Sequence, residues 1–370
     1  MPANVFVDNS TGDNGDTGGD TDPWQTFQYA LDNIDTAAGF GNGINWINVS
    51  DQATETLTAN QDWTNHGTRN NDTRIGVRGW GRGGDGYGRF SVGAYDLVPL
   101  NTQYINMSFL KISGATVCTL EGGNYNHYND IFLEGDYDNV LGLMRLGNGT
   151  GIRLSIKNTN TGTNPYCIRM NGGGRLSESY LESKKCLYAT SGSNARVRKT
   201  CFNVTAANGC GIYYNNSYPR IDACSFYSTS KTGTLAIDTL SSHSANITNN
   251  LIQGFDTDWD DGTNANSVKC LTLIDNSVSD CTNKDIVGYT EGQVEAYGNE
   301  DLLAVDLFAK VGTIDYLDWE TIIDFFRPEV VGNVVANSPL GHSRGAVAHA
   351  AGGGGGTDSM LRRSNLRGGY

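Results

Sequence analysis

The sequence predicts an all-β fold of the parallel β-helix, or solenoid, type, and three observations support this prediction. Glycine makes up 48 of the 370 residues, which indicates frequent turns. An apolar motif returns every 21 to 26 residues through the middle of the chain. Within each copy, apolar and polar residues alternate as they do in a strand with one buried face. One solenoid coil per repeat accounts for all three observations.

Residues 1–40 are expected to form a strand, an acidic loop and a capping helix. A solenoid needs such a cap because its first coil otherwise exposes an apolar edge. In DTDPWQTFQYALDNI, Asp22 is the expected N-cap and Pro23 the first helical residue. The apolar face of this helix would consist of Trp24, Phe27, Ala30, Leu31 and Ile34.

Residues 41–300 are expected to form the β-helix itself. Stacked coils place like residues above one another. The predicted apolar column consists of Leu110, Leu133, Ile156, Leu181, Phe202, Phe226, Ile252 and Val278. A polar column is predicted at Ser179, Thr200, Cys224, Asn250 and Asn276. Leucine-rich repeats have a similar length, but their L-x-x-L-x-L-x-x-N signature is absent. The glycine-rich segment 76–90 is interpreted as a protruding loop.

Charge and hydropathy exclude several classes of protein. The formal net charge of −14 disfavours binding to nucleic acid and to anionic membranes. No stretch approaches the roughly 18 apolar residues of a membrane span. The first residues lack the basic leader and apolar core of a secretory signal. We therefore expect synthesis in a cytoplasm, without membrane insertion.

The eight cysteines and the acidic loops bear on disulfides and metals. The cysteines form no CxxC pairs, so free thiols inside the core are favoured over disulfides or zinc. Asp256, Asp258 and Asp260 alternate like the first half of a calcium loop, but glycine and glutamate are missing at its sixth and twelfth positions. Solvated turns are favoured here and in the acidic segment 13–22, with structural calcium as the alternative. No other cofactor is expected.

Two segments resemble a known family, the right-handed parallel β-helix proteins of the pectate-lyase-like superfamily. VFVDNSTGDNGDTGGDTDPWQTFQYALDNI is similar to their start, and DFFRPEVVGNVVANSPLGHSRGAVAHA is similar to their terminator. The resemblance covers about residues 1–350 and implies a C-terminal cap at 301–350. The family contains polysaccharide lyases and hydrolases, bacteriophage tailspikes, and binding or structural proteins. The resemblance therefore implies a fold and leaves the activity open.

An enzyme of this family would need charged residues grouped on one face. A lyase would need a base and a cation, and the basic residues available at stacked positions are Arg153, Lys157, Lys184, Lys185, Arg196, Arg198 and Lys199. Solubilising strand edges are the favoured interpretation of these residues. Asp222 and Asp238 are candidate hydrolase carboxylates, but their separation does not match the repeat. No catalytic residue is assigned, and a lyase or depolymerase acting on acidic glycans remains the alternative function.

The C-terminal segment 351–370 carries a different chemistry. Gly352 to Gly356 form a flexible hinge. The segment after it interleaves apolar and cationic residues, a composition suited to docking on a partner. The predicted docking residues are Met360, Leu361, Arg362, Arg363, Leu366, Arg367 and Tyr370.

Together these features predict a non-enzymatic structural protein of a phage particle. A β-helix with a hinged basic arm and no export signal fits a capsid decoration or a tail fibre or spike. The expected partners are other virion proteins, contacted through the arm, and host-surface polysaccharide. The sequence leaves a homotrimer open.

Overall fold

The computed structural model describes residues 2–64, 70, 72–190, 195–215, 220–239, 244–260, 270–274, 276–288, 294–297, 299–302, 306–310 and 312–328. The chain divides into two compact units. The first contains Met1–Arg175 and Leu181–Ala195, and the second contains Leu176–Tyr180 and the chain from Arg196 onward. Both are built from parallel strands, which confirms the predicted right-handed parallel β-solenoid.

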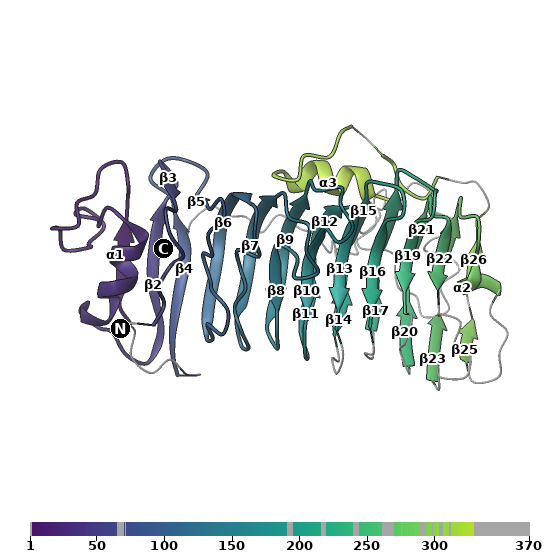
Figure 1. Cartoon of the computed structure of the whole chain (residues 1–370), viewed down its shortest axis with the longest axis horizontal. Coiled ribbons are helices and arrows are strands. Elements are labelled where there is room, and N and C mark those ends of the chain that lie inside the picture. Colours follow the sequence, from purple (N-terminus) through teal and green to yellow (C-terminus); the bar gives the residue numbers. More distant parts are fainter. Residues whose placement is uncertain are drawn as a thin grey trace, which may run out of the picture. The chain divides into compact units, whose positions relative to one another are not determined.

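The first unit stacks its strands in parallel ladders (Figure 1). One ladder runs β1–β2–β4–β6–β7–β9, a second pairs β3 with β5 and β5 with β6, and a third runs β8–β10–β13. The strands are β1 (Asn4–Val7), β2 (Gly43–Ser50), β3 (Thr54–Thr56), β4 (Thr73–Trp80), β5 (Gly88–Ser91), β6 (Ile105–Ala115), β7 (His127–Gly135), β8 (Met144–Leu146), β9 (Thr150–Asn158), β10 (Tyr166–Met170) and β13 (Lys185–Ala189).

The second unit repeats this arrangement in three ladders, β14–β17–β20–β23–β25, β15–β18–β21–β24–β26 and β16–β19–β22. Its strands are β14 (Arg196–Arg198), β15 (Cys201–Val204), β16 (Cys210–Tyr214), β17 (Arg220–Asp222), β18 (Ser225–Ser228), β19 (Leu235–Asp238), β20 (Ser244–Thr248), β21 (Leu251–Gln253), β22 (Thr257–Asp260), β23 (Cys270–Ile274), β24 (Ser277–Ser279), β25 (Val294–Tyr297) and β26 (Glu300–Asp301). Two strands, β11 (Arg175–Ser177) and β12 (Tyr180–Ser183), span the boundaries between the units in the sequence.

The predicted apolar column forms in the second unit. Phe202 pairs with Phe226, Phe226 with Ile252, and Ile252 with Val278. The Phe202 and Phe226 rings stack with centroids 4.7 Å apart and planes 7° from parallel. In the first unit, Leu133 pairs with Ile156 as expected, but its partner on β6 is Ile112. The assignment of Leu110 to this column was therefore wrong by two residues.

The predicted polar column is an asparagine ladder in the second unit. Asn250 Nδ2 donates to Asn276 Oδ1 at 2.9 Å, and Asn276 Nδ2 donates to Asn299 Oδ1 at 2.9 Å. The Cys224 amide donates to Asn250 Oδ1 at 2.8 Å. Asn250 and Asn276 are fully buried, so these bonds satisfy amide groups that would otherwise destabilise the core.

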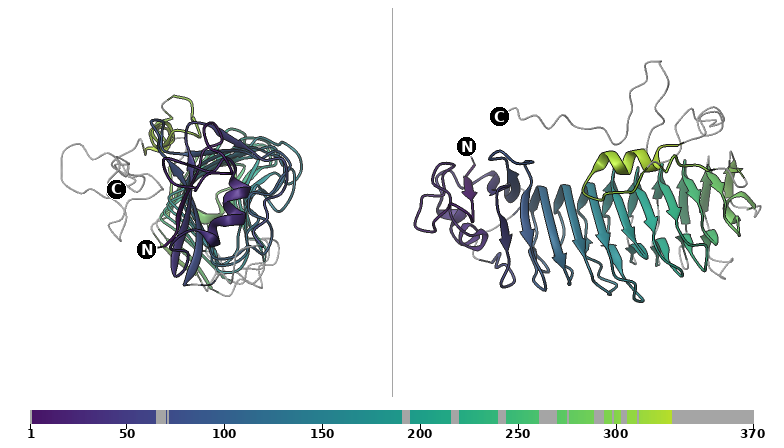
Figure 2. Two further views of the ribbon diagram at one scale, coloured as in Figure 1. Left: turned by 90° about the vertical axis from the view of Figure 1, so that its left-hand side faces the viewer. Right: turned by 90° about the horizontal axis from the view of Figure 1, so that it is seen from above.

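The N-terminal helix forms and covers the first coil, but it begins later than predicted. Helix α1 (Phe27–Asn33) starts after Thr26, whose hydroxyl accepts a hydrogen bond from the Tyr29 amide. A 3₁₀ turn, η1 (Ile34–Thr36), follows. Asp22 instead accepts hydrogen bonds from Thr17. Figure 2 shows α1 lying across the open end of the coil. The residues of the predicted apolar face are buried.

The described part of the predicted C-terminal cap packs on the outer face of the second unit's strands (Figure 1). Helix α3 (Trp319–Phe326) buries Ile322 and Phe326 against Leu251 and Phe308. Leu251 alternates with the inward Ile252, so it belongs to the outer surface. A further short helix, α2 (Asp285–Gly288), contacts β22. The rest of the segment to residue 350 lies outside the described residues.

Other predictions have clear outcomes. Segment 76–90 is not a single loop, because β4 occupies its beginning and β5 its end.

Seven cysteines, all buried, are free thiols, as predicted for this part of the chain. Non-glycine residues with positive φ recur along the coils: Phe109, Asp130 and Arg153 lie inside β6, β7 and β9 of the first unit, and Ala223 and Asn249 lie between consecutive strands of the second. Within the described residues, helices are too short or too polar to cross a membrane.

Candidate functional site

The first unit gathers arginines and aromatic rings on the outer face of its longest ladder. Arg74 and Arg78 lie at alternate positions of β4, so both side chains point outward, and Arg82 follows in the next loop. Each guanidinium lies over an aromatic ring. The Arg74, Arg78 and Arg82 Cζ atoms lie 5.7, 4.8 and 4.7 Å from the ring centroids of Tyr104, Trp46 and Trp80. These six residues are called the arginine–aromatic face below.

The position of Trp46 depends on a glycine in the neighbouring strand. Trp46 of β2 is in register with Gly76 of β4. A Cβ atom built on Gly76 would lie 2.3 Å from Cε3 of the indole. Only glycine therefore allows the half-buried Trp46 ring to lie over β4 beside Arg78. Glycine here serves packing and not a turn.

Arg78 has no carboxylate partner among the described residues. Its Nε donates to Asn48 Oδ1 at 2.6 Å, which fixes the guanidinium plane over Trp46. Partial burial lowers the pKa of Arg78 from its usual value, but an arginine remains charged at neutral pH. The two terminal nitrogens can therefore receive a planar anion.

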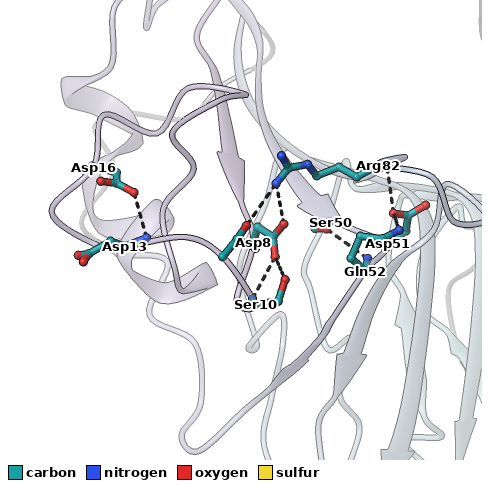
Figure 3. Close-up of polar contacts among 9 residues, drawn as sticks. Asp8, Ser10, Asp13, Asp16, Ser50, Asp51, Gln52 and Arg82 are labelled. Carbon is teal, nitrogen blue, oxygen red and sulfur yellow. Dashed lines mark hydrogen bonds and ion pairs between the residues drawn. The ribbon is translucent and has the colours of Figure 1, made fainter.

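Arg82, by contrast, is neutralised and held in place by Asp8 (Figure 3). Its NH1 atom lies 2.9 Å from Asp8 Oδ2. The pKa of Asp8 falls to about 2; burial raises it, but hydrogen bonds from Ser10 and Arg82 outweigh that effect. Asp51 accepts hydrogen bonds from the amides of Arg82 and Gly86, both at 2.9 Å. This network fixes the loop after β4 and with it the guanidinium over Trp80.

Two tyrosines extend the face beside Arg74. The Tyr104 and Tyr125 rings stack with centroids 5.3 Å apart and planes 8° from parallel, and Tyr125 is exposed. Arg74 NH1 donates to Asn106 Oδ1 and to the Tyr125 carbonyl. Partial burial and the nearby Arg74 lower the pKa of His127, so this imidazole is neutral at pH 7. The positive charge of the face therefore comes from its arginines.

Three cations of the basic stripe considered for a lyase pair with carboxylates. Arg153 pairs with Asp130 at 2.6 Å, Lys157 pairs with Glu182 at 3.1 Å, and, in the second unit, Arg198 pairs with Asp222 at 3.0 Å. Lys184 donates to the Thr161 and Gly162 carbonyls. These contacts favour the structural interpretation of the stripe.

The predicted calcium residues are not brought together as a metal site. Within the described part of the chain, no group of three or more His, Cys, Asp or Glu side chains could hold a metal ion. Asp258 is fully buried and accepts hydrogen bonds from the amides of Trp259, Asp285 and Ile286. Asp256 and Asp260 are half-buried at either end of the same segment. Asp258 therefore acts as the N-terminal anchor of α2.

The predicted docking residues Met360, Leu361, Arg362, Arg363, Leu366, Arg367 and Tyr370 lie outside the described residues. The arginine–aromatic face was not predicted from the sequence, because residues 76–90 were interpreted as a loop. The signal that could have found it is TRIGVRGW, in which Arg74 and Arg78 alternate with the buried Ile75 and Val77.

Comparison with known proteins gives no evidence about the function of this site. No family model matches the sequence, and no curated protein matches it. Among solved structures, the chain is similar to a GH136 lacto-N-biosidase from Eubacterium ramulus, with 10% sequence identity and a TM-score of 0.39 over 81% of this chain and 68% of the other. A likeness this distant carries no argument about function.

Proposed function

We propose that the protein is a non-enzymatic structural protein that binds acidic glycans through the arginine–aromatic face. The observation that carries this proposal is Arg78, which is stacked over Trp46 and has no carboxylate partner among the described residues. Indole rings stack on the apolar face of a sugar ring, and guanidinium groups bind carboxylates and sulfates through two parallel hydrogen bonds. Acidic sugars carry both of these features.

The negative charge of the rest of the protein favours binding of acidic glycans at the arginine–aromatic face alone. The whole chain carries a formal charge of −14, so most of its surface repels polyanions. A local group of arginines on such a background directs an acidic chain to one place. We expect binding to weaken as salt concentration rises, because part of the affinity is electrostatic.

We further propose that this scaffold belongs to a phage particle, as a capsid decoration or a tail fibre or spike. The composition of residues 351–370 supports a hinged arm that docks on other virion proteins. Mass spectrometry of purified particles should detect the polypeptide. A homotrimer stays a prediction. Purified particles without this polypeptide would overturn the virion assignment and leave glycan binding untouched.

Calorimetry with polygalacturonate, hyaluronan and neutral dextran tests glycan binding. We expect at least one of the acidic chains to bind and dextran to bind at least tenfold more weakly. Arg78→Gln should weaken the acidic binding tenfold or more. Arg198→Gln is the matched control, because this exposed arginine already pairs with Asp222. Equal binding by both variants would overturn the assignment of the site.

The same polysaccharides distinguish the proposed binding function from the alternative function, a polysaccharide lyase. A lyase releases an unsaturated uronate that absorbs in the ultraviolet, whereas a binding protein leaves the polymer intact. We expect no such absorbance after prolonged incubation with polygalacturonate or hyaluronan. Its appearance, and its loss in Arg78→Gln, would replace the binding function with the enzymatic one.

A further inference from the structure

A second polar feature of the first unit shares no residue with the arginine–aromatic face and lies where β3 meets the start of α1. A pocket of about 460 Å³ opens there. Its volume falls within the range of roughly 300–1,000 Å³ that is usual for small-molecule sites. The pocket is lined by Asn9, Gln25, Thr26, Gln28, Glu55, Thr56, Leu57, Thr58 and Gln61. This site is called the Glu55 pocket below.

Glu55 occupies a position that strand alternation directs into the core. It is the middle residue of β3 and is in register with the buried Phe90. An apolar side chain would normally fill such a position, because an unpaired carboxyl group in the core lowers stability. Glu55 is only 8% exposed. The carboxyl group at this place therefore needs an explanation other than packing.

Only one of the two Glu55 carboxyl oxygens accepts a hydrogen bond from the protein. Oε1 accepts a hydrogen bond from the Phe27 amide at 3.1 Å, which holds the first residue of α1. Oε2 is buried and has no hydrogen-bond partner. None of the ion pairs between described residues involves Glu55. Burial raises the pKa of this group; the Phe27 amide lowers it, as does the nearby Asn9 side chain, although the Asn9 amide makes its hydrogen bond to the Thr54 carbonyl.

Gln61 contributes a second unsatisfied acceptor to the same pocket. The side chain is 6% exposed, and its Oε1 has no hydrogen-bond partner. Its Nε2 donates to the Ala59 carbonyl at 2.9 Å, which fixes the orientation of the amide. Two buried oxygens of one pocket thus lack donors, and a ligand that supplies donors would satisfy both.

The rest of the pocket wall is rigid and polar. Gln28 bonds to Asp32 through Nε2 and accepts from the Asp62 amide at 2.8 Å. Thr26 is fixed as the N-cap of α1, and Asn9 donates to the Thr54 carbonyl. A pre-formed wall of this kind binds a ligand without the entropy loss of ordering side chains. The rim, which includes Gln25, Thr56 and Thr58, is exposed, so a ligand can enter from solvent.

From these observations we infer that the Glu55 pocket binds a small neutral polyhydroxy compound, such as a single sugar residue, whose hydroxyl groups donate to Glu55 Oε2 and Gln61 Oε1. Sugar hydroxyls both donate and accept, as threonine and amide side chains require, and Leu57 supplies an apolar contact for the ring. A calcium ion fits less well, since it prefers several carboxylates and the lining contains one.

Saturation-transfer NMR and thermal shift with the intact protein test this inference. The probes are glucose, galactose, mannose, N-acetylglucosamine and lactose, with glucosamine and CaCl₂ as cationic comparisons. At least one neutral sugar should bind and raise the melting temperature. Glu55→Gln keeps an acceptor for the Phe27 amide but presents a donor to the ligand, so it should weaken binding tenfold or more. Gln61→Leu should do the same by removing the second acceptor.

The matched control is Arg78→Gln, which removes the proposed acidic-glycan contact and should leave sugar binding in the Glu55 pocket unchanged. Conversely, Glu55→Gln should leave polygalacturonate or hyaluronan binding unchanged, so the two proposals can fail independently. Absence of binding by all five neutral sugars would overturn the inference. So would neutral-sugar binding that survives in both pocket variants, or binding of glucosamine or calcium without any neutral sugar.

Discussion

Glu55 in the first unit and Asp258 in the second are both buried carboxyl groups on strands, and each holds the first residue of a helix. They differ in the use of their oxygen atoms. Asp258 Oδ1 accepts from the Trp259 and Asp285 amides, and its Oδ2 accepts from the Ile286 amide. Glu55 uses Oε1 alone, for Phe27. The complete arrangement in the second unit is what a purely structural carboxylate looks like. In the first unit, Glu55 Oε2 has no hydrogen-bond donor, which is what we expect of a group that binds a ligand.

The largest effect is expected from Asp258→Ala. This substitution leaves three backbone amides without an acceptor, and we expect a loss of roughly 3 kcal/mol in the free energy of unfolding. Urea denaturation measures it, with Asp258→Asn as an intermediate variant that keeps one acceptor. A loss below about 0.5 kcal/mol would mean that full hydrogen bonding does not define the structural carboxylate.

Asn276→Ala tests whether satisfied buried polar groups matter elsewhere in the second unit. Asn276 Oδ1 accepts from the Asn250 amide and side chain, and its Nδ2 donates to the Ile247 carbonyl. We expect a loss of about 2 kcal/mol, measured by the urea midpoint. Thr58→Ala, on the exposed rim of the Glu55 pocket, is a control that should change stability little. A harmless Asn276→Ala would show that the ladder is dispensable.

The dependence of stability on pH tests the buried environment of Asp258. Burial raises the pKa of Asp258 from 3.8 to about 7, despite the three amide donors. A raised folded-state pKa means that the unfolded chain ionises first, so this group's contribution to stability is lost as pH rises from about 4 to about 7. The stability of Asp258→Asn relative to the wild type should therefore increase over this range, by at most about 1.4 kcal/mol for each pH unit. If the difference in unfolding free energy between Asp258→Asn and the wild type did not change with pH, the raised pKa of Asp258 would be contradicted.

The smallest effect is expected from Glu55→Gln, and its sign is opposite to that of Asp258→Ala. Burial raises the pKa of Glu55, so a neutral amide avoids the desolvation of a charge at pH 7. We expect the melting temperature to stay equal or rise by a few degrees, which corresponds to no more than about 1 kcal/mol. A loss as large as that of Asp258→Ala would make Glu55 a structural group as well.

Sequence could predict the repeat because an inward apolar position recurs in every coil. The column from Phe202 to Val278 followed from this period alone. Leu110 was misplaced because it and Ile112 both point inward on β6, and a shift of two residues keeps every side chain on its own face. The late start of α1 was also hidden, since Trp24 instead joins Val7 in a β-bridge.

The binding features were harder to predict than the coils. Gly76 suggested a turn, whereas it makes room for the Trp46 ring, and that relation exists only once β2 and β4 are in register. Glu55 lies in the polar sequence Thr54–Thr56, where nothing local distinguishes the inward residue from its neighbours. Its pocket is formed with α1, more than 20 residues earlier in the chain. Contacts of this kind follow from tertiary structure.

The recurring positive-φ residues have a practical consequence for engineering. In the first unit, Phe109, Asp130 and Arg153 occur after intervals of 21 and 23 residues, and in the second, Lys199, Ala223 and Asn249 occur after 24 and 26. The strands at these residues stay in register although the intervals differ, so the extra residues are accommodated in the connecting segments. Foreign peptides inserted into those segments should therefore be displayed without disturbing the scaffold, provided that the positive-φ residue and the strands around it are retained.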